Sequence, residues 1–453
     1  MNEVEIILKN AKIIGKTGEY NLKLNNGKIA EISKQRLKGD EDIDISGNII
    51  LPGLIDPHVH FRDPGLTYKE SFKTGSMAAA NGGWTTVMDM PNTIPPTNSA
   101  KDFIEKEKIA NKKSIVNFKL HAGVNGKTTN EEIEKMIKLN PASFKVFMDL
   151  ENDEILENIF NKLAIVKNKE NINSKNVIVT THCENKEIIE EKTEDMKKKS
   201  IKRGNIPIDY SYARPVESEV VSVQYAIELA KKYDLNLHIC HISTKKALAI
   251  VKNERNSKNN ENNKNNKNNK NNKNNKNNKI TSEITPHHLF LNNCAFETYE
   301  NMIKTNPPLR PNGENLTIND LTAIDMIGTD HAPHIIEEKK KGVWNSSPGI
   351  PNLETTLSLL LTEVNNKRLD ISIIPKLLSQ NPAKRFGLNN KGAIEVGKDA
   401  DLVVIDLKKE GKFNVDEFYT KAKYSPFNGQ KYIGKATKTY VNGKLVMEDG
   451  IVL

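Results

Sequence analysis

The segment DPHVHFRDPG, residues 56–65, follows an apolar run and places two histidines and an arginine at alternating positions. In an extended strand, residues i, i+2 and i+4 lie on one face, so His58, His60 and Arg62 are predicted to point the same way. Two imidazoles and a guanidinium are costly to bury together unless a metal ion or an anion meets them. The segment therefore predicts a metal or anion site at the end of a strand.

The other histidines indicate that this site involves more than one segment. All ten histidines of the chain lie in or just after short apolar segments of its middle part. Imidazole and carboxylate groups suit Zn²⁺ or a similar divalent ion, and four histidines exceed what one catalytic zinc usually takes. Two ions are therefore expected, with a hydroxide clamped between them. The candidate ligands are His58, His60, His182, His241 and Asp330.

Lys145 is a candidate for the anion that two neighbouring cations require. In the segment SFKVFMD, strand alternation places Ser143, Lys145 and Phe147 on one face. A bare ammonium beside two metal ions would be repelled by them, whereas a carbamate on the same side chain is a bidentate anion. A lysine that extends along apolar surface to reach solvent is the alternative.

Eight apolar segments in the middle of the chain must position these residues. Charged, amphipathic stretches separate the segments, and this alternation is typical of a parallel sheet of β-α units. Eight units predict an α/β fold with a TIM-like (β/α)8 barrel, whose active site lies at the C-terminal ends of the strands. The segments read LIDPHVHF, WTTVMDM, NFKLHAGV, SFKVFM, VIVTTHCE, LNLHICHIS, ITSEITPHH and MIGTDHAPH.

The two ends of the chain differ from its middle. Short alternating segments such as VEIILKNAKII and TKTYVNGKLVMEDGIVL predict strands, and Asn26-Gly27 and Asn442-Gly443 mark tight hairpins. Both ends are therefore predicted to form antiparallel sheet. At 453 residues, of which 37% are hydrophobic, the chain is long enough for one large domain and a smaller one.

Cysteine content and hydropathy argue against a disulfide-bonded protein and against a membrane protein. Only Cys183, Cys240 and Cys294 are present, with no CxxC pair, which argues against disulfides and a thiolate zinc site. Cys183 and Cys240 adjoin candidate ligand histidines, so alternation is expected to turn them to the opposite face. No apolar run of about 18 residues and no signal-peptide pattern occur, which favours a soluble cytoplasmic protein with no membrane partner.

The net charge of +9 is concentrated in one segment. Residues 252–279 contain nine Lys or Arg and two Glu, hence +7, and the remaining residues carry +2. This Asn/Lys-rich insertion has no apolar residue and is predicted to be a disordered surface loop. No nucleic-acid partner is expected, since no aromatic side chain is interleaved for base stacking.

Distinctive motifs extend along nearly the whole chain: SGNIILPGLIDPHVHFRDPG, GGWTTVMDMPNT, FKVFM, THCEN, HICHIST, TPHHLFL, NPPLRP, GTDHAPH, QNPAKRFGL and GKDADLVVID. This series resembles the amidohydrolase superfamily, and within it the dihydroorotases of the longer, class I type. The resemblance implies a metal-dependent barrel at residues 51–389. It also implies one small β-sandwich domain built from residues 1–50 and 390–453.

The resemblance further implies a binuclear zinc centre that is bridged by Lys145 as N6-carboxylysine. Its ligands would be His58, His60, Lys145, His182, His241 and Asp330. Some bacterial relatives carry an aspartate in place of the modified lysine, and Asp149 lies close enough in sequence to keep that alternative open. The FKVF context favours Lys145, because it is similar to that of the carboxylated members.

The implied activity is the reversible cyclisation of N-carbamoyl-L-aspartate to L-dihydroorotate plus water, a step of pyrimidine (UMP) biosynthesis. In the hydrolytic direction Asp330 is the expected general base and acid. The implied substrate contacts are Arg62, Asn92 and His334 for the carboxylate and Asn306, Pro348 and Gly349 for the ring. For Asn306, a turn residue before Pro307 is an equal alternative.

Another cyclic amidase, an allantoinase or a dihydropyrimidinase (hydantoinase), is the alternative function. Arg62 discriminates, because the ring substrates of those relatives carry no carboxylate in that place. A non-catalytic scaffold protein is a further alternative, and the retained ligands argue against it. The sequence leaves open homo-oligomerisation, association with aspartate carbamoyltransferase and the physiological metal. The remaining histidines are expected to support ligands or to be structural: His121, His238, His287, His288 and His331.

Overall fold

The computed structural model describes residues 4–169, 177–265 and 279–453. Each of the eight predicted apolar segments contains a β-strand, and the neighbouring strands pair in parallel. One parallel sheet has the order β6-β7-β8, and the other has the order β14-β13-β12-β11-β10-β9. The bounds are β6 Leu54–Val59, β7 Trp84–Asp89, β8 Asn117–Leu120, β9 Ala122–Gly123, β10 Phe144–Phe147, β11 Ile178–His182, β12 Asn236–Ile239, β13 Ile280–Ile284 and β14 Met326–Ile327.

The two parallel sheets adjoin at both ends, although their ladders do not form one continuous sheet among the described residues. Only His121 separates β8 from β9, and its backbone N–H donates to the carbonyl of Asp89 on β7. On the other side, Val59 of β6 forms an isolated parallel bridge with His331, which follows β14. The predicted α/β class is confirmed, and the parallel strands neighbour one another in sequence order.

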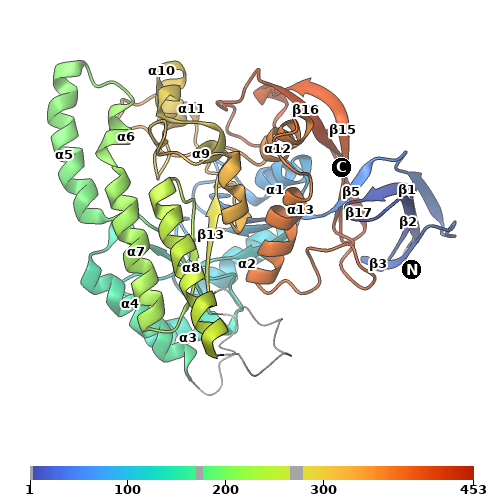
Figure 1. Cartoon of the computed structure of the whole chain (residues 1–453), viewed down its shortest axis with the longest axis horizontal. Coiled ribbons are helices and arrows are strands. Elements are labelled where there is room, and N and C mark those ends of the chain that lie inside the picture. The colour runs from blue at the N-terminus through green and yellow to red at the C-terminus, as the bar shows by residue number, and fades with distance from the viewer. Residues whose placement is uncertain (1–3, 170–176, 266–278) are drawn as a thin grey trace.

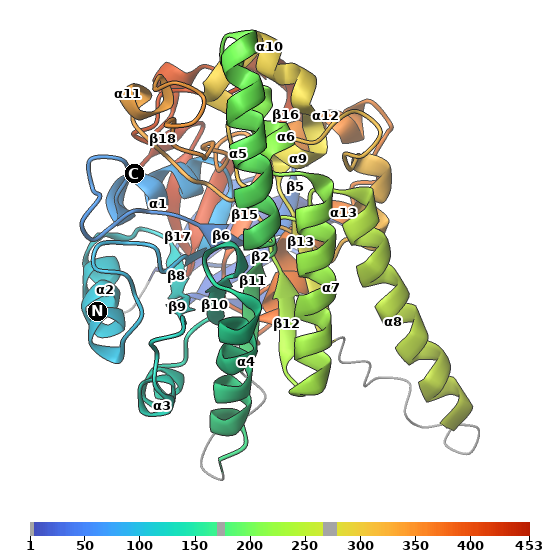
Figure 2. The same ribbon diagram turned by 90° about the vertical axis from the view of Figure 1, so that its left-hand side faces the viewer.

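Helices connect the parallel strands and cover their outer side, as Figures 1 and 2 show. The first five helices begin at a Ser, Thr or Asn whose side chain accepts a hydrogen bond from a backbone N–H of the first turn. None of the described helices has the length and apolar character needed to cross a bilayer. The bounds are α1 Phe72–Asn81, α2 Ala100–Lys113, α3 Asn130–Lys138, α4 Asp153–Lys167, α5 Lys186–Arg203, α6 Asp209–Ala213, α7 Val216–Lys232, α8 Lys245–Asn265, α9 Pro286–Phe290, α10 Phe296–Tyr299, α11 Ile336–Lys339, α12 Thr356–Asn365, α13 Ile373–Pro375 and α14 Asn381–Arg385.

Both ends of the chain contribute to a nine-stranded sheet of order β18-β17-β16-β15-β5-β1-β2-β3, with β4 paired to β1. The hairpins predicted at Asn26-Gly27 and Asn442-Gly443 are confirmed, because these residues have positive φ and join antiparallel strands. β15 pairs with β5 and thereby joins the two ends (Figure 1). The bounds are β1 Ile6–Ile13, β2 Glu19–Asn25, β3 Lys28–Ser33, β4 Glu41–Asp44, β5 Ile49–Pro52, β15 Leu402–Lys412, β16 Lys431–Val441, β17 Lys444–Glu448 and β18 Ile451–Val452.

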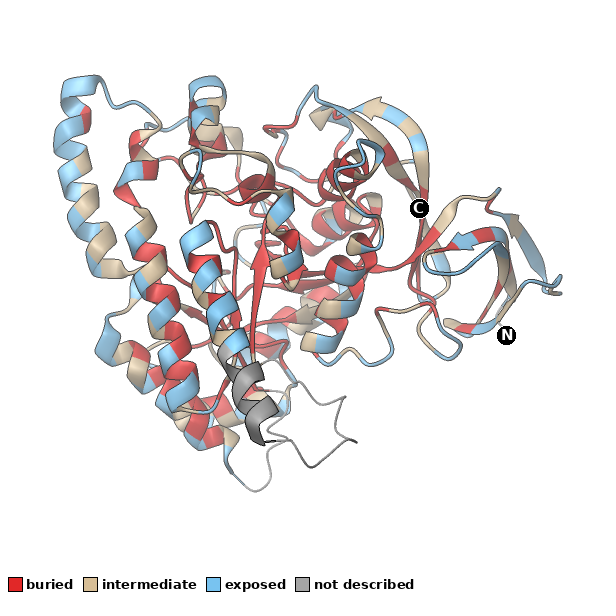
Figure 3. Cartoon of the chain, viewed as in Figure 1, coloured by how far each residue is buried: buried red, intermediate tan, exposed pale blue. Residues whose placement is uncertain are grey.

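The terminal sheet has a hydrophobic core of its own, which includes Leu8, Leu22, Ile50 and Leu402. Two of its pairings, β1 with β4 and β1 with β5, are parallel, so the predicted antiparallel arrangement holds only for the other pairs. A larger core packs the parallel strands against their helices. Figure 3 shows buried residues along these strands and on the inner helix faces, whereas α5 is largely exposed. Two cores agree with a large and a small domain, whose boundaries stay predictions.

The Asn/Lys-rich insertion begins later than predicted. α8 continues to Asn265, so the first half of the segment expected to be a disordered loop is helical. Arg255 anchors this helix, because its guanidinium donates to the carbonyls of Ile280 and Ala323 and pairs with Asp325. Arg255 thus holds the start of the segment through acceptors that lie far away in sequence. Residues 266–278, the other part of that prediction, lie outside the described residues.

Candidate metal centre and substrate cavity

A cavity of about 220 Å³ lies at the C-terminal ends of the parallel strands. All of the residues predicted to bind metal or substrate line it, together with Phe147, Asp149 and Ala332. The predicted residues are His58, His60, Arg62, Asn92, Lys145, His182, His241, Asn306, Asp330, His334, Pro348 and Gly349. The structure thus brings together side chains from most of the length of the chain, while their individual roles stay predictions.

His58, His60 and Asp330 form one half of the candidate metal centre, with His58 on β6, His60 just after it and Asp330 after β14. Asp330 Oδ1 lies 2.9 Å from His60 Nε2 and 3.4 Å from His58 Nε2. On the other side of each ring, His60 Nδ1 lies 2.7 Å from the amide oxygen of Asn92, and His58 Nδ1 lies 2.5 Å from Glu283 Oε1. These contacts leave the Nε2 atoms of both rings directed toward Asp330, an orientation that suits metal ligands.

His182 and His241 form the second half, at the ends of β11 and β12. His182 Nδ1 lies 3.0 Å from His241 Nε2, and the ring centroids are 4.7 Å apart. The His241 and His58 ring centroids are 5.3 Å apart, so the two halves meet. On its outer side, His182 Nε2 lies 2.9 Å from Glu184 Oε2 and 3.6 Å from Asp149 Oδ2.

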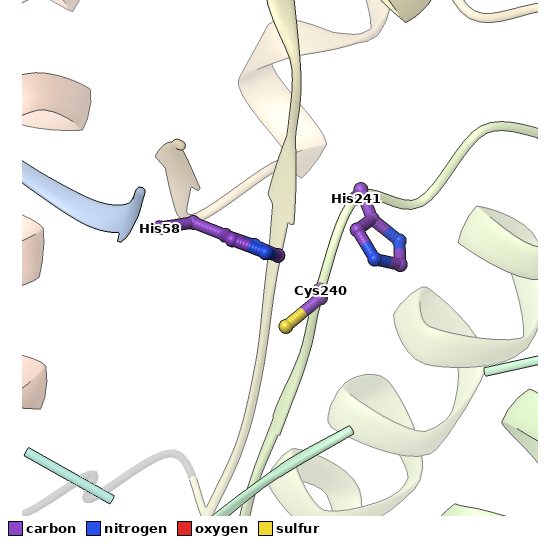
Figure 4. A group of neighbouring side chains, drawn as sticks. All are labelled: His58, Cys240 and His241. Atoms are coloured by element: carbon purple, nitrogen blue, oxygen red, sulfur yellow. The ribbon is translucent and has the colours of Figure 1, made fainter. Parts of the chain in front are cut away.

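Lys145 on β10 points into the same cavity, and its contact corrects the prediction for Cys240. The Lys145 side chain is 1% exposed, and its Nζ lies 2.9 Å from Cys240 Sγ. The thiol does not turn away, since Cys240 Sγ and a ring nitrogen each of His58 and His241 lie within 4.8 Å of one another (Figure 4). Alternation fails because β12 ends at Ile239, and the chain then bends through His241 with a φ of 32°.

Burial of the site favours neutral imidazoles beside an ionised carboxylate. Burial lowers the pKa of His60 to about 4, against the opposing effect of Asp330. Burial, with His182 and His58 nearby, also holds the pKa of His241 well below its usual range. For Asp330, burial alone would raise the pKa, but His58 and His60 outweigh it and lower the pKa of the carboxyl. Neutral imidazole and ionised carboxylate are the forms that bind metal ions.

The surroundings of His241 and Lys145 fit divalent metal ions. His241 Nδ1 is buried and has no hydrogen-bond partner among the described residues. Lys145 has no carboxylate within 4.0 Å in the described part of the chain, which is a costly environment for a buried ammonium. Arg62, His241 and Asp330 all have positive φ, a strained conformation that concentrates at functional sites.

Arg62 lies in the cavity wall, and none of the described acidic residues forms an ion pair with it. Its side chain is buried, and its Nε has no hydrogen-bond partner among the described residues. One of its terminal nitrogens lies 3.2 Å from His334 Nε2. The neighbouring acid, Asp63, instead pairs with Lys113 at 2.7 Å. A buried guanidinium with free donors beside a cavity suits an anionic ligand.

His334 lies between Arg62 and the loop that carries Pro348. Its Nδ1 is 2.9 Å from Glu338 Oε2, and its Nε2 is 3.0 Å from the carbonyl oxygen of Pro348. Lys69 also lies 3.2 Å from Nδ1 and forms an ion pair with Glu338 at 2.7 Å. Burial, with Arg62 nearby, lowers the pKa of His334 to about 3, so the imidazole is neutral near neutral pH.

Asn306 and Gly349 form another part of the cavity wall. Asn306 accepts a 2.6 Å hydrogen bond from the hydroxyl of Tyr210, and it also precedes Pro307 through a cis peptide. Asn306 lines the cavity, while its contact with the ring and the alternative of a turn residue both stay predictions. Gly349 has a φ of 147°, and a Cβ there would lie 2.2 Å from the carbonyl oxygen of Ala332, so no larger residue fits.

The sequence did not predict the charged residues that hold the candidate ligands. Glu283 on β13 contacts His58, and a carboxylate inside an apolar strand was the signal that could have found it. Arg214, just before α7, donates to Glu184 with two nitrogens and to Asp149 at 3.0 Å. No local pattern marks Arg214, because both of its partners follow other strands.

The remaining histidines and Cys183 agree with the prediction that they are supporting or structural. None of them is among the described residues that line the cavity. His238 contacts Glu283 at 3.1 Å and thus stands behind His58. The Cys183 thiol donates to the Thr181 hydroxyl at 3.1 Å, and Cys183 does not line the cavity.

Comparisons with known proteins match nearly the whole chain. Residues 49–446 match the model of the Amidohydrolase family. A curated dihydroorotase of Methanosphaera stadtmanae is 44% identical over 99% of this chain and 97% of its own length. A dihydroorotase of Methanothermobacter thermautotrophicus is 45% identical over 96% of this chain and 92% of its own.

Solved structures place the same architecture in related enzymes. The L-hydantoinase (dihydropyrimidinase) from Arthrobacter aurescens has a TM-score of 0.88 at 30% identity and covers 100% of this chain and 98% of its own. The family match spans both parallel sheets and, of the terminal sheet, β5, β15, β16 and part of β17. The chain therefore belongs to the amidohydrolase family, and it is a hydrolase.

Proposed function

We propose that the chain is a dihydroorotase of the class I type, which interconverts N-carbamoyl-L-aspartate and L-dihydroorotate plus water in pyrimidine biosynthesis. The observation that carries this proposal is the buried Arg62 guanidinium, which lines the cavity without an acidic partner among the described residues. L-dihydroorotate carries a carboxylate on its ring, and a planar guanidinium can bind a carboxylate through two parallel hydrogen bonds. The names of relatives at 44–45% identity support the same substrate.

Two zinc ions are proposed to occupy the candidate metal centre. The residues that would hold them are His58, His60, His182, His241, Asp330 and a carboxylated Lys145. When bound, the ions supply Lewis-acid activation of water and of the amide carbonyl. The chemistry of the donor set supports this assignment, because neutral imidazoles and an ionised carboxylate converge on one cavity.

Lys145 is preferred to Asp149 as the bridging anion because of their surroundings. Asp149 Oδ2 already accepts a hydrogen bond from Arg214 at 3.0 Å. Lys145, in contrast, is buried without a carboxylate partner in the described part of the chain. Carboxylation would remove the buried ammonium and provide the anion.

Asp330 is the proposed general base and acid. Its lowered pKa keeps the carboxyl ionised near neutral pH, so in the hydrolytic direction it can take a proton from the attacking water. The water oxygen bonds to the ring amide carbon, the C–N bond breaks, and Asp330 delivers the proton to the leaving nitrogen. Cyclisation reverses these steps.

The substrate carboxylate is proposed to lie against Arg62, Asn92 and His334. The Asn92 oxygen is engaged by His60, so its amide N–H₂ group is the part that is left for substrate. Asn306 and the backbone of Pro348 and Gly349 would contact the ring. These groups lie in one cavity with the candidate metal ligands, which supports the assignment.

We also propose that the parallel strands close into a (β/α)8 barrel at residues 51–389, with a β-sandwich domain formed by residues 1–50 and 390–453. The adjoining ends of the two parallel sheets support a closed barrel. The likeness to the L-hydantoinase over the whole chain supports the complete arrangement.

A second candidate function is that of another cyclic amidase, because a solved L-hydantoinase and a solved dihydropyrimidinase share the fold. An absorbance assay for loss of dihydroorotate, with and without a chelator, separates the two. Dihydroorotate hydrolysis that the chelator abolishes, with negligible turnover of dihydrouracil and allantoin, is the expected result. Preferential turnover of dihydrouracil or allantoin would assign the second function instead.

A further inference from the structure

Lys339 is a buried cation that the proposed chemistry does not use. It is the last residue of α11, and its side chain is fully buried. Its Nζ donates hydrogen bonds to three backbone carbonyls, those of Lys304 at 3.1 Å, Ser347 at 3.0 Å and Gly349 at 2.9 Å. No carboxylate forms an ion pair with it among the described residues. Its partners are therefore peptide groups rather than an acid.

The three carbonyls belong to two segments that line the cavity. Lys304 lies two residues before Asn306, and Ser347 and Gly349 flank Pro348. The segments also contact each other directly, because the Gly349 N–H donates to the Lys304 carbonyl at 2.8 Å. An ammonium has three donors, and all three are used here, so one side chain fixes the spacing of both segments.

Neighbouring contacts connect the two segments that Lys339 holds with the proposed carboxylate site and with the C-terminal part of the chain. The Pro348 carbonyl oxygen lies 3.0 Å from His334 Nε2, so the loop that Lys339 holds also contacts His334. Tyr424, between β15 and β16, donates its hydroxyl to the Gly349 carbonyl at 3.0 Å. The Gly349 peptide is thus held from two sides.

Packing alone does not explain a lysine at this position. Burial disfavours the ammonium and holds the pKa of Lys339 well below its usual range. An apolar side chain of the same length would fill the space without this cost. An apolar side chain could not, however, hold three carbonyls of two separate segments at a fixed spacing.

We propose that Lys339 is a positioning residue that holds the Asn306 segment and the Pro348-Gly349 loop at the spacing that the substrate ring requires. This inference rests on the proposed function, because it assumes that the ring contacts this wall. Lys339 acts through the carbonyls it binds and not through the substrate.

The test compares Lys339→Met with Lys340→Met in zinc-loaded enzyme. Methionine has a similar length and no donors, and Lys340 is the exposed neighbour of Lys339. We expect Lys339→Met to raise KM for dihydroorotate about tenfold, with kcat within about threefold, because the wall shifts while Asp330 stays in place. Lys340→Met should change neither constant.

Amide hydrogen exchange gives a readout that does not depend on activity. The Gly349 amide, which donates to the Lys304 carbonyl, should exchange faster in Lys339→Met and at the normal rate in Lys340→Met. If Lys339→Met does not fold, Tyr424→Phe removes one of the two donors to the Gly349 carbonyl. It should raise KM by a smaller factor, about threefold.

The outcomes separate this inference from the proposed function. A folded Lys339→Met enzyme with normal KM and normal exchange at Gly349 would overturn the inference while wild-type turnover upheld the function. Wild-type protein that does not hydrolyse dihydroorotate would overturn the function. In that event, faster exchange at Gly349 in Lys339→Met alone would still support the anchoring of the wall.

Discussion

The cavity has two halves that are built in different ways. We call them the metal half, with the candidate ligands His58, His60, Lys145, His182, His241 and Asp330, and the substrate half, with the candidate contacts Arg62, Asn92, Asn306, His334, Pro348 and Gly349. The metal half lies at strand ends, and its side chains contact one another directly, as in the 2.9 Å contact between His60 and Asp330 and the 3.0 Å contact between His182 and His241. The substrate half lies mostly on the connections that follow the strands. These connections depend on lysines that are buried outside the cavity.

Lys106 and Lys339 are examples of such anchors in the substrate half. Lys106 on α2 is 1% exposed, pairs with Asp89 at 2.6 Å and donates to the Met90 carbonyl at 2.7 Å. Asp89 in turn accepts from the Phe61 N–H at 2.6 Å, so the connections after β6 and β7 meet at this pair. Strand register fixes a strand end, whereas an irregular connection needs such anchors to hold its side chains in place.

The largest effect is expected from Lys145→Ala, which breaks the metal half. The bridging anion should be lost, and bound zinc and activity with it. Metal analysis and the dihydroorotate assay measure both. Asp149→Ala should be milder, and partial rescue of Lys145→Ala by acetate would support the carbamate. The assignment is wrong if Asp149→Ala abolishes zinc binding while Lys145→Ala retains it.

Asp330→Asn should keep the fold and reduce kcat by about 10²–10⁴, the usual contribution of a positioned general acid or base. Circular dichroism and zinc content serve as controls, since any displaced metal would add to the loss. Nearly full activity in a zinc-replete sample would remove Asp330 from the mechanism.

Lys106→Met tests the anchors of the substrate half through stability. It leaves the Asp89 carboxylate buried without its partner, a change that costs about 3–5 kcal/mol of the free energy of unfolding. Denaturant unfolding measures this cost. Lys108→Met on the same helix, whose partner Glu105 is exposed, should cost less than about 1 kcal/mol. Equal losses for the two variants would mean that the buried pair is no anchor.

Arg62→Met should have the smallest of these effects, restricted to one substrate. It should raise the activation free energy for dihydroorotate, as calculated from kcat/KM, by about 1.5–3 kcal/mol. This is the range for a hydrogen bond to a charged group. Turnover of dihydrouracil, which lacks the carboxylate, should stay very low and nearly unchanged. If Arg62→Met destabilises the protein but leaves the preference between the two rings intact, Arg62 does not read the carboxylate.

The metal half was the more predictable of the two because its signals are local. Strand alternation placed His58 and His60 on one face, and the parallel β-α pattern brought His182, His241 and Asp330 to the same end of the sheets. The hairpins at Asn26 and Asn442 could also be predicted from the sequence, because an Asn-Gly pair favours a tight turn whatever the rest of the fold. Alternation does not apply to Cys240, which follows the end of β12 at Ile239, or to Arg62, which lies beyond the end of β6 at Val59 and has a φ of 61°.

The sequence by itself determined the order of the parallel strands, the residues that gather at their ends and the joining of the two termini through motifs of a known family. The tertiary structure alone decided which charged side chains support them. Glu283 contacts His58, and Arg214 contacts Asp149. In the same way, Lys339 holds the Pro348 loop, and Arg255 holds the start of the insertion. A side chain that donates to a distant carbonyl or carboxylate leaves no periodic trace in its own segment, because its partner is chosen by packing in three dimensions.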